Sequence, residues 1–267
     1  MRTFTYCVLV AAVAPILGCV TTEGQQFNLL TTEEEAALGE KVAAQIEQDE
    51  KVLDDPQLQA YLRGIGERLA LNAPRKDVEY RFTVIDNPET VNAFALPGGR
   101  MYVYTGLIKL CENEAELAAV MAHECGHVAA YHHGEMLTRQ YGIELIIGLL
   151  LGEEPGQLAQ VTAGLIGTGV SMRFSRQNER EADQLGMNIM YLAGYNPEAM
   201  VAFMNRLLAE EQAQGGVQHL PIFSSHPATE VRLQYLSEMA QQFPAEVRGQ
   251  NRLYKERYQA QALSRIE

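Results

Sequence analysis

Apolar residues recur with helical spacing along most of the 267-residue chain, and they alternate with polar residues over one short region only. Two helix starts are well marked. Thr32 followed by Glu35 is typical of a capping box, and Asp55 before Pro56 is typical of an N-cap with proline in the first turn. The sequence predicts helices over residues 33–51, 56–71, 113–133, 176–193, 197–212 and from about 228 onward, with a polar helical tail over 243–267.

The alternating region predicts a small sheet. Strands are expected at Tyr80–Ile85, Val91–Leu96 and Met101–Thr105, with a turn at Pro97-Gly98-Gly99 between the last two. Because helices dominate and the strands fall in one segment, we expect an α+β protein. Residues 31–267 are expected to form a single domain.

Two apolar helical pieces, at residues 143–151 and 158–170, are joined by a Gly- and Pro-containing connection. Each is shorter than the ~20 residues that a membrane-spanning helix needs. We expect a buried helical hairpin. The alternative is an apolar lip that faces a membrane or a substrate.

The first residues have the form of a secretory signal, in which Arg2 precedes an apolar stretch that ends at Gly18-Cys19. Cys19 after Gly18 resembles a bacterial lipobox, which predicts that residues 1–18 are removed and that the cysteine receives lipid. An ordinary signal peptide with an incidental cysteine is the alternative. Residues 19–30 are expected to be a tether. Because no Asp follows the cysteine, the resemblance implies a periplasmic lipoprotein anchored to the outer membrane.

The chain carries 21 Lys and Arg against 34 Asp and Glu, so its formal net charge is −13. This acidity argues against a nucleic-acid partner, because phosphate binding needs clustered basic side chains. A hydrophobic fraction of 47% excludes a disordered polyelectrolyte. Cys111 and Cys125 are separated by about a dozen helical residues, or ~18 Å, so we expect two reduced thiols rather than a disulfide.

The segment His123-Glu124-Cys125-Gly126-His127 has the H-E-x-x-H pattern within a strongly helix-forming stretch. Residues four apart lie on one helix face, so His123 and His127 can reach one metal ion, and zinc favours such nitrogen ligands. Glu124 lies one residue round the helix, where it can accept a proton from a metal-bound water. An amphipathic helix with incidental histidines is the alternative.

A catalytic zinc ion usually has three protein ligands and one open position. Glu179 is the candidate third ligand, because Glu179 and Asp183 lie one turn apart on a second predicted helix. Asp183 would accept the free ring N–H of a ligating histidine. Glu181 is the second choice as ligand. His132 and His133 are expected to be exposed, beyond the metal-binding face of their helix.

Together, His123-Glu124-x-x-His127 and Glu179-x-x-x-Asp183 form the gluzincin pattern. Three further segments narrow the resemblance: VNAFALPGG at 91–99, YTGL at 104–107 and SHP at 225–227. Over roughly residues 30–240 the chain resembles the HtpX and CAAX prenyl protease family of metallopeptidases, in particular its periplasmic branch related to BepA and LoiP.

The resemblance implies a mainly helical zinc endopeptidase of the bacterial cell envelope, with one zinc ion per chain, that removes misfolded or unassembled outer-membrane proteins. Zinc would activate a water molecule, with Glu124 as the general base. The strand formed by Asn92, Ala93, Phe94 and Ala95 would lie at the edge of the sheet beside the zinc and bind an extended polypeptide through backbone hydrogen bonds. An ordinary internal strand is the alternative.

His226 and Arg232 are further active-site candidates, delivered by a loop that contains Gln214-Gly215-Gly216 and by Pro227, which presets the next helix. His226 could stabilise the oxyanion of the reaction intermediate. The resemblance implies a second role, in which the matching histidine takes the fourth zinc position and holds the enzyme inactive. We expect such a latch, lifted when substrate pairs with the edge strand, with Arg232 supporting the intermediate. A helix cap is the alternative for His226.

Two other functional classes remain open at this point. The first is a chaperone-like or binding protein with a quiescent zinc site, and the presence of Glu124 argues against it. The second is a structural zinc module, which needs four protein ligands, often cysteines. Only Cys111 and Cys125 follow Cys19, which makes the structural module the weaker hypothesis.

Overall fold

The structure is a computed structural model that describes residues 28–152, 155–166, 173–213, 220–226, 229–249 and 252–266. The predicted signal peptide, Cys19 and most of the predicted tether lie outside these ranges. The loop stretch Gln214–Gly216 and Pro227 lie outside them as well.

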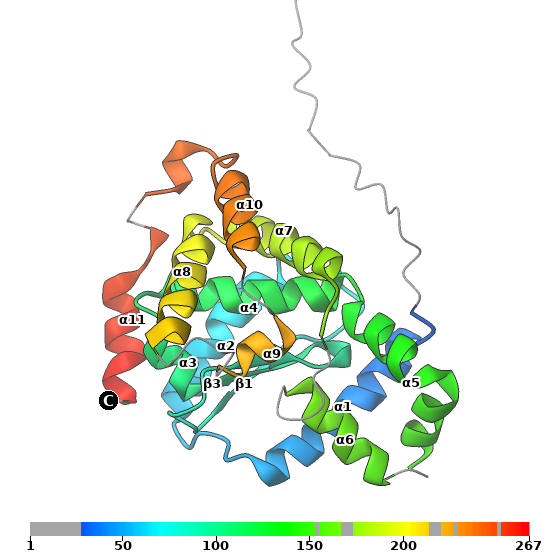
Figure 1. Cartoon of the computed structure of the whole chain (residues 1–267). Coiled ribbons are helices and arrows are strands. Elements are labelled where there is room, and N and C mark those ends of the chain that lie inside the picture. The colour runs from blue at the N-terminus through cyan, green and yellow to red at the C-terminus, as the bar shows by residue number, and fades with distance from the viewer. Residues whose placement is uncertain are drawn as a thin grey trace, which may run out of the picture.

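The described chain is mainly helical with one small sheet, which confirms the predicted α+β class (Figure 1). Its helices are α1 (Thr32–Asp49), α2 (Pro56–Ala70), α3 (Thr105–Leu110), α4 (Glu114–Ala129), α5 (His132–Leu151), α6 (Pro155–Leu165), α7 (Arg176–Leu192), α8 (Glu198–Ala213), α9 (Ile222–Ser225), α10 (Glu230–Ala240) and α11 (Lys255–Gln261). Its strands are β1 (Arg81–Ile85), β2 (Ala93–Ala95) and β3 (Arg100–Tyr104).

The sheet has the strand order β1-β3-β2, with β1 parallel and β2 antiparallel to β3. The connection between β2 and β3 is a short 3-10 turn, where Gly98 and Gly99 take left-handed backbone with φ of 81° and 99°. Such backbone favours glycine because it has no Cβ. The turn returns the chain antiparallel to β2. Because β1 pairs with the other side of β3, β2 lies at the edge of the described sheet, as the sequence predicted.

The sheet is buried on both faces because its side chains alternate between two clusters. Phe94, Tyr102 and Tyr104 face a cluster that includes the apolar side of α1. Ala93 and Val103 face the larger cluster, which includes α2 and α4. Figure 1 shows α4 crossing the middle of the molecule, with the sheet on one side, α7 and α10 on the other, and α8 running past one end of α4.

The first helix begins one residue earlier than predicted. Thr31 is its N-cap and Glu34 completes the capping box, whereas Thr32 and Glu35 were the predicted pair. Successive threonines and glutamates offer both registers, and tertiary contacts decide between them. The Glu35 carboxylate is buried and lies 2.7 Å from the Arg75 guanidinium, so it is engaged away from the cap.

The predicted helix 113–133 is in fact two helices, α4 and α5. Tyr131 takes left-handed backbone with φ 59°, which ends the first helix and turns the chain. The Arg75 guanidinium holds this turn, since it lies over the Tyr131 ring at 3.8 Å and donates to the Val128 carbonyl at 3.1 Å. The prediction that His132 and His133 are exposed is wrong, because the turn places both inside the molecule, 1% and 3% exposed.

The apolar hairpin is formed by the end of α5 and by α6, and the part of the second predicted piece beyond residue 166 lies outside the described residues. Ile146, Leu149 and Val161 are buried against α1, while Ile147 and Leu151 are exposed. Within the described ranges, no helix has the length and apolar character to cross a membrane.

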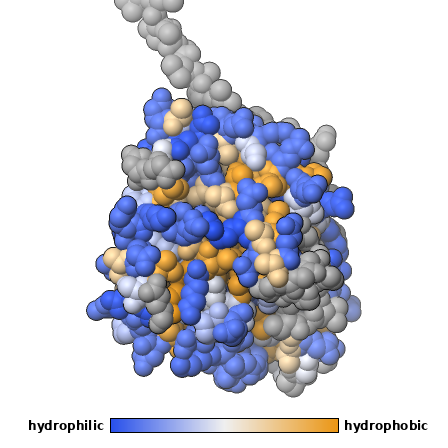
Figure 2. Space-filling view, turned by 60° about the vertical axis from the view of Figure 1, so that its left-hand side comes forward, coloured by the Kyte–Doolittle hydropathy of each residue, from blue (hydrophilic) through white to orange (hydrophobic). Residues whose placement is uncertain are grey.

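The C-terminal half differs from expectation in three places. The helix α9 lies in a stretch predicted as loop, the helix expected near 228 begins at Glu230 with Thr229 as its N-cap, and the described tail is α-helical only over α11. Cys111 and Cys125 are free, as predicted, and both are buried. On the face shown in Figure 2, polar residues predominate and hydrophobic residues gather in a band between them.

Candidate metal centre

Two histidines on α4 form the base of the site. His123 and His127 lie one helical turn apart and are almost completely buried. Their Nε2 atoms are 3.1 Å apart. The helix carries them into the interior because it packs between the sheet and α7, so nearly all of its residues are buried.

The helix α7 adds Glu179 to this pair. Ser175 begins the helix with a capping box that includes Asn178, and this places Glu179 in the first turn, facing α4. Its Oε1 lies 3.4 Å from Nε2 of His127, and its Oε2 lies 3.6 Å from Nε2 of His123. The second-choice ligand, Glu181, is not in this group, and its Oε2 lies 3.5 Å from Nε2 of His132 instead.

His226 completes the group from the end of α9. Its Nδ1 lies 3.2 Å from Nε2 of His123 and 2.9 Å from Oε1 of Glu179. Its other nitrogen, Nε2, lies 3.4 Å from Oε1 of Glu124. Glu124 is thereby adjacent to the cluster without being one of its four ligand groups.

The donor set fits a zinc ion. The four ligand atoms of His123, His127, Glu179 and His226 lie within 4.8 Å of one another, and all four residues are buried. Zinc bonds of ~2.0–2.1 Å in a tetrahedron put ligand atoms about 3.3–3.4 Å apart. The contacts of 3.1, 3.2 and 3.4 Å in the cluster are close to that spacing.

Polar and charged side chains of α7 and α10 contact the cluster. Asp183 Oδ1 lies 2.9 Å from Nδ1 of His123, on the side of the ring away from the cluster. Arg232 donates to Asp183 from Nε at 2.9 Å and from Nη2 at 2.7 Å, and its Nη1 lies 2.6 Å from Oε2 of Glu179. Tyr235 also donates to Asp183. Arg232 therefore bridges Asp183, which contacts His123, and Glu179, the candidate carboxylate ligand.

These contacts shift the protonation equilibria of the site. Burial opposes ionisation of Asp183, but the charges of Arg232 and His123 outweigh it and lower its pKa to about 2. Burial also opposes ionisation of Glu179, but the charges of His226 and Arg232 outweigh it and hold the pKa of Glu179 well below the usual range. Burial lowers the pKa of His127 well below its ordinary value. The result is two carboxylates and a neutral imidazole, the forms that suit metal binding.

The edge strand adjoins Glu124. The backbone groups of Asn92 and Leu96 form hydrogen bonds with β3. Because the direction of these groups alternates along a strand, the N–H and C=O groups of Ala93 and Ala95 face away from β3. The outward Ala95 N–H donates to Oε2 of Glu124 at 3.0 Å. Phe94 directs its ring toward the tyrosines of β3, and the Asn92 side-chain amide donates to the Ile166 carbonyl at 3.0 Å.

Two buried residues near the cluster were not expected from the sequence. Phe174 lies against the rings of His127 and His226, at 3.9 and 5.3 Å between ring centroids. His132 Nδ1 lies 3.0 Å from Nδ1 of His127. No short motif marks Phe174. The sequence shows that His132 follows His127 by five residues, but the contact between them depends on the left-handed turn at Tyr131.

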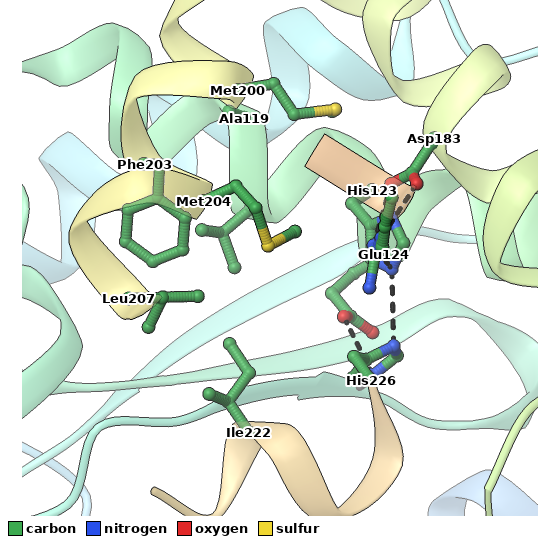
Figure 3. A pocket seen from close by; sticks show the side chains of 12 residues that line it. Ala119, His123, Glu124, Asp183, Met200, Phe203, Met204, Leu207, Ile222 and His226 are labelled. Carbon is green, nitrogen blue, oxygen red and sulfur yellow. Dashed lines mark hydrogen bonds and ion pairs between the residues drawn. The ribbon is translucent and has the colours of Figure 1, made fainter. Parts of the chain in front are cut away.

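An apolar pocket opens beside the cluster (Figure 3). His123, Glu124, Asp183 and His226 form its polar side, and Figure 3 shows apolar side chains of α4, α8 and α9 on the opposite side. These apolar residues are Ala119, Val120, Met200, Phe203, Met204, Leu207 and Ile222. A side chain placed here would be held by apolar contacts next to the candidate metal.

Residues 56–240 match the model of peptidase family M48, and the chain belongs to this family of metallopeptidases. The family resemblance inferred from the motifs is thereby confirmed. The chain is similar to the Beta-barrel assembly-enhancing protease of Escherichia coli (strain K12), with 32% identity over 215 residues, which cover 77% of this chain and 44% of that protein.

Two further relatives extend the comparison. The Mitochondrial metalloendopeptidase OMA1 of Schizosaccharomyces pombe is 32% identical over 180 residues, 67% of this chain and 52% of that protein. The Putative beta-barrel assembly-enhancing protease of Vibrio cholerae is 30% identical over 226 residues, 81% of this chain and 46% of that protein. The chain spans about half the length of the curated relatives that it matches.

Proposed function

We propose that this protein is a zinc-dependent endopeptidase that holds one zinc ion through His123, His127 and Glu179. The proposal rests on one observation: these three side chains are buried, and their ligand atoms lie close together, next to Glu124 and the edge strand β2. Membership of family M48 supports the same reaction class. The donor set contains no cysteine, which argues against a structural zinc module.

Zinc at this cluster would act as a Lewis acid that polarises the carbonyl of the scissile peptide bond. The residues of the chain then supply the remaining steps. Glu124 accepts the proton of the attacking water and passes it to the leaving nitrogen. Asp183 holds the ring of His123 through Nδ1. Arg232, which lines the pocket beside the cluster, would support the negative charge that develops at the carbonyl oxygen.

Substrate binding would begin at the sheet edge. An extended polypeptide that pairs with β2 would form hydrogen bonds with the outward-facing backbone groups of Ala93 and Ala95. It would replace the Ala95-to-Glu124 hydrogen bond and so release the carboxylate for proton transfer. Backbone pairing does not depend on side-chain identity, which suits unfolded chains as substrates. The apolar pocket would favour a large apolar residue near the cleaved bond.

The sequence and the names of the relatives support a proposal for the cellular role. The lipobox-like Cys19 supports an outer-membrane lipoprotein in the periplasm, which mass spectrometry of the mature N-terminus tests. Two relatives are called beta-barrel assembly-enhancing proteases, and this supports a role in quality control of misfolded or unassembled outer-membrane proteins.

The direct test is hydrolysis of casein, an unfolded polypeptide, by the purified protein. We expect chelation to abolish cleavage and zinc to restore it. Glu124→Gln should lower the rate by about 10²–10⁴-fold with zinc still bound, because only the proton acceptor is lost. Cleavage sites should be rich in large apolar residues. The exposed Glu112 gives the matched control, and Glu112→Gln should cleave normally.

Undiminished cleavage by Glu124→Gln would reject the proposed mechanism. A different function, a chaperone-like protein with a latched site, is favoured by the close contacts of His226 with His123 and Glu179. It predicts that wild-type protein and Glu124→Gln suppress aggregation of unfolded substrate equally and that neither cleaves it.

A further inference from the structure

His132 is a buried imidazole that the proposed hydrolysis leaves without a role. It is the first residue of α5, and the left-handed turn at Tyr131 directs it back toward α4. The residue is 1% exposed, and its Nδ1 lies 3.0 Å from Nδ1 of His127. Two imidazole nitrogens at this distance in the interior require one to donate and the other to accept.

The candidate metal site decides the direction of that hydrogen bond. His127 faces the cluster with Nε2, which lies 3.1 Å from Nε2 of His123 and 3.4 Å from Oε1 of Glu179. A histidine that binds metal through Nε2 carries its hydrogen on Nδ1. The Nδ1–H of His127 therefore donates to Nδ1 of His132, and the hydrogen of His132 lies on Nε2.

Glu181 stands beside that second nitrogen. Its Oε2 is 3.5 Å from Nε2 of His132, so the order is carboxylate, imidazole, then the candidate ligand His127. The other histidine of the cluster is held differently, since Asp183 Oδ1 contacts Nδ1 of His123 directly at 2.9 Å. Helix α7 thus places a carboxylate near both rings: Asp183 contacts His123 directly, whereas Glu181 lies near Nε2 of His132, a buried atom that makes no hydrogen bond within the described residues.

We propose that His132 is a positioning residue for the metal centre, which fixes the orientation and tautomer of His127, and that the nearby Glu181 carboxylate favours the tautomer of His132 with its hydrogen on Nε2. The proposal rests on the proposed zinc site but not on catalysis. It concerns how tightly and in which geometry the ion is held. Outer partners of ligating histidines typically contribute 10–100-fold to metal affinity.

The test is zinc affinity, measured by competition with a chromogenic chelator. His132→Leu removes the acceptor and should weaken zinc binding by about 10–100-fold. His132→Asn should restore most of the affinity, because the amide oxygen is bonded to Cγ just as Nδ1 is. The matched control is His133→Leu. His133 is equally buried, but its ring lies 6.1 Å from that of His127, so affinity should stay at the wild-type value.

Two further measurements guard against misfolding of the His132 variants. Glu181 is 29% exposed, so Glu181→Gln should fold normally and weaken zinc binding by a few-fold. The visible spectrum of the cobalt-substituted protein should shift in His132→Leu and return toward wild type in His132→Asn.

Several results would overturn the proposal: wild-type affinity in His132→Leu, no recovery in His132→Asn, or an equal loss in His133→Leu. These results are distinguishable from failure of the proposed function. A wild-type protein that binds zinc but never cleaves casein leaves the role of His132 intact. A protein that cleaves casein with unchanged zinc affinity in every variant rejects only that role.

Discussion

At the scale of single residues, His226 is in contact with both the candidate ligands and the candidate base. It reaches Glu179 and His123 with Nδ1 and approaches Glu124 with Nε2. Burial disfavours its charged form, but the neighbouring carboxylates of Glu179 and Glu124 outweigh burial and raise its pKa. In the proposed zinc site, His226 occupies the position that a substrate carbonyl and water need.

We therefore predict that His226→Ala raises casein hydrolysis several-fold while zinc stays bound. Truncation opens the fourth position, and three protein ligands suffice for a catalytic zinc ion. Activity and zinc content are measured on the same preparation. Ser225→Ala in the same turn is the control and should match wild type. A fall in activity with zinc retained would show instead that His226 is a donor to the transition state.

The sequence predicted the residues of this cluster better than their surroundings. The spacing of His123 and His127 on one helix, and of Glu179 and Asp183 on another, is a local property of helices, and the structure brings all four together. The burial of His132 was missed because it depends on long-range contacts. Arg75 lies far away in the sequence, yet it holds the turn that directs His132 inward.

At the scale of elements, the site depends on a close approach of α4 and α7. Gly126 lies at the crossing, where an added Cβ would stand 2.6 Å from the Ala182 carbonyl oxygen and 3.0 Å from the Ala182 Cα. Only a residue without a side chain allows this separation. The helices themselves could be predicted from periodicity and capping residues, but their crossing is a property of two distant segments.

Gly126→Ala should force these helices apart and so widen the gap between His127 and Glu179, now 3.4 Å. We expect zinc affinity to fall by at least about tenfold and the free energy of unfolding to fall by about 1–3 kcal/mol, the usual range for overpacking. Chelator competition and urea denaturation measure the two effects.

The control for this substitution is Gly64→Ala in α2, where an added Cβ meets nothing within 4 Å. Alanine is the better helix former, so this change should stabilise the protein by about 0.5–1 kcal/mol and leave zinc binding unchanged. If Gly126→Ala bound zinc as tightly as Gly64→Ala does, the close crossing would have no part in shaping the site.

At the scale of the whole molecule, Glu114 ties the metal-binding helix to distant segments. Its carboxylate is fully buried at the start of α4 and accepts hydrogen bonds from Tyr61 at 2.6 Å and from Tyr195 at 2.6 Å. Arg68 of α2 lies 3.1 Å away, and Arg257 of α11 donates to it as well. Helix α11 lies beyond the residues that match the family model, so this contact joins the tail to the family region.

Glu114→Ala should therefore destabilise the whole protein without changing the metal site itself. Removal of the one carboxylate leaves Arg68 and Arg257 without this partner and two tyrosine hydroxyls without their acceptor. The side chains of Arg68 and Arg257 are 33% and 41% exposed and can be hydrated, so the loss comes mainly from the tyrosine hydroxyls, at about 1–3 kcal/mol for a buried polar group without its partner. The free energy of unfolding from urea titrations gives the loss.

The matched control is Glu112→Ala, which removes an exposed carboxylate that pairs with Arg206 across 2.7 Å. Exposed pairs of this kind contribute about 0–1 kcal/mol, so its stability should stay near that of wild type. Glu114 precedes His123 by about two and a half helical turns, so both variants, while folded, should bind one zinc ion with the wild-type affinity. If the two variants were equally stable, the contacts of Glu114 would not hold the tail to α4. If folded Glu114→Ala lost zinc, the contacts of Glu114 would shape the metal site directly.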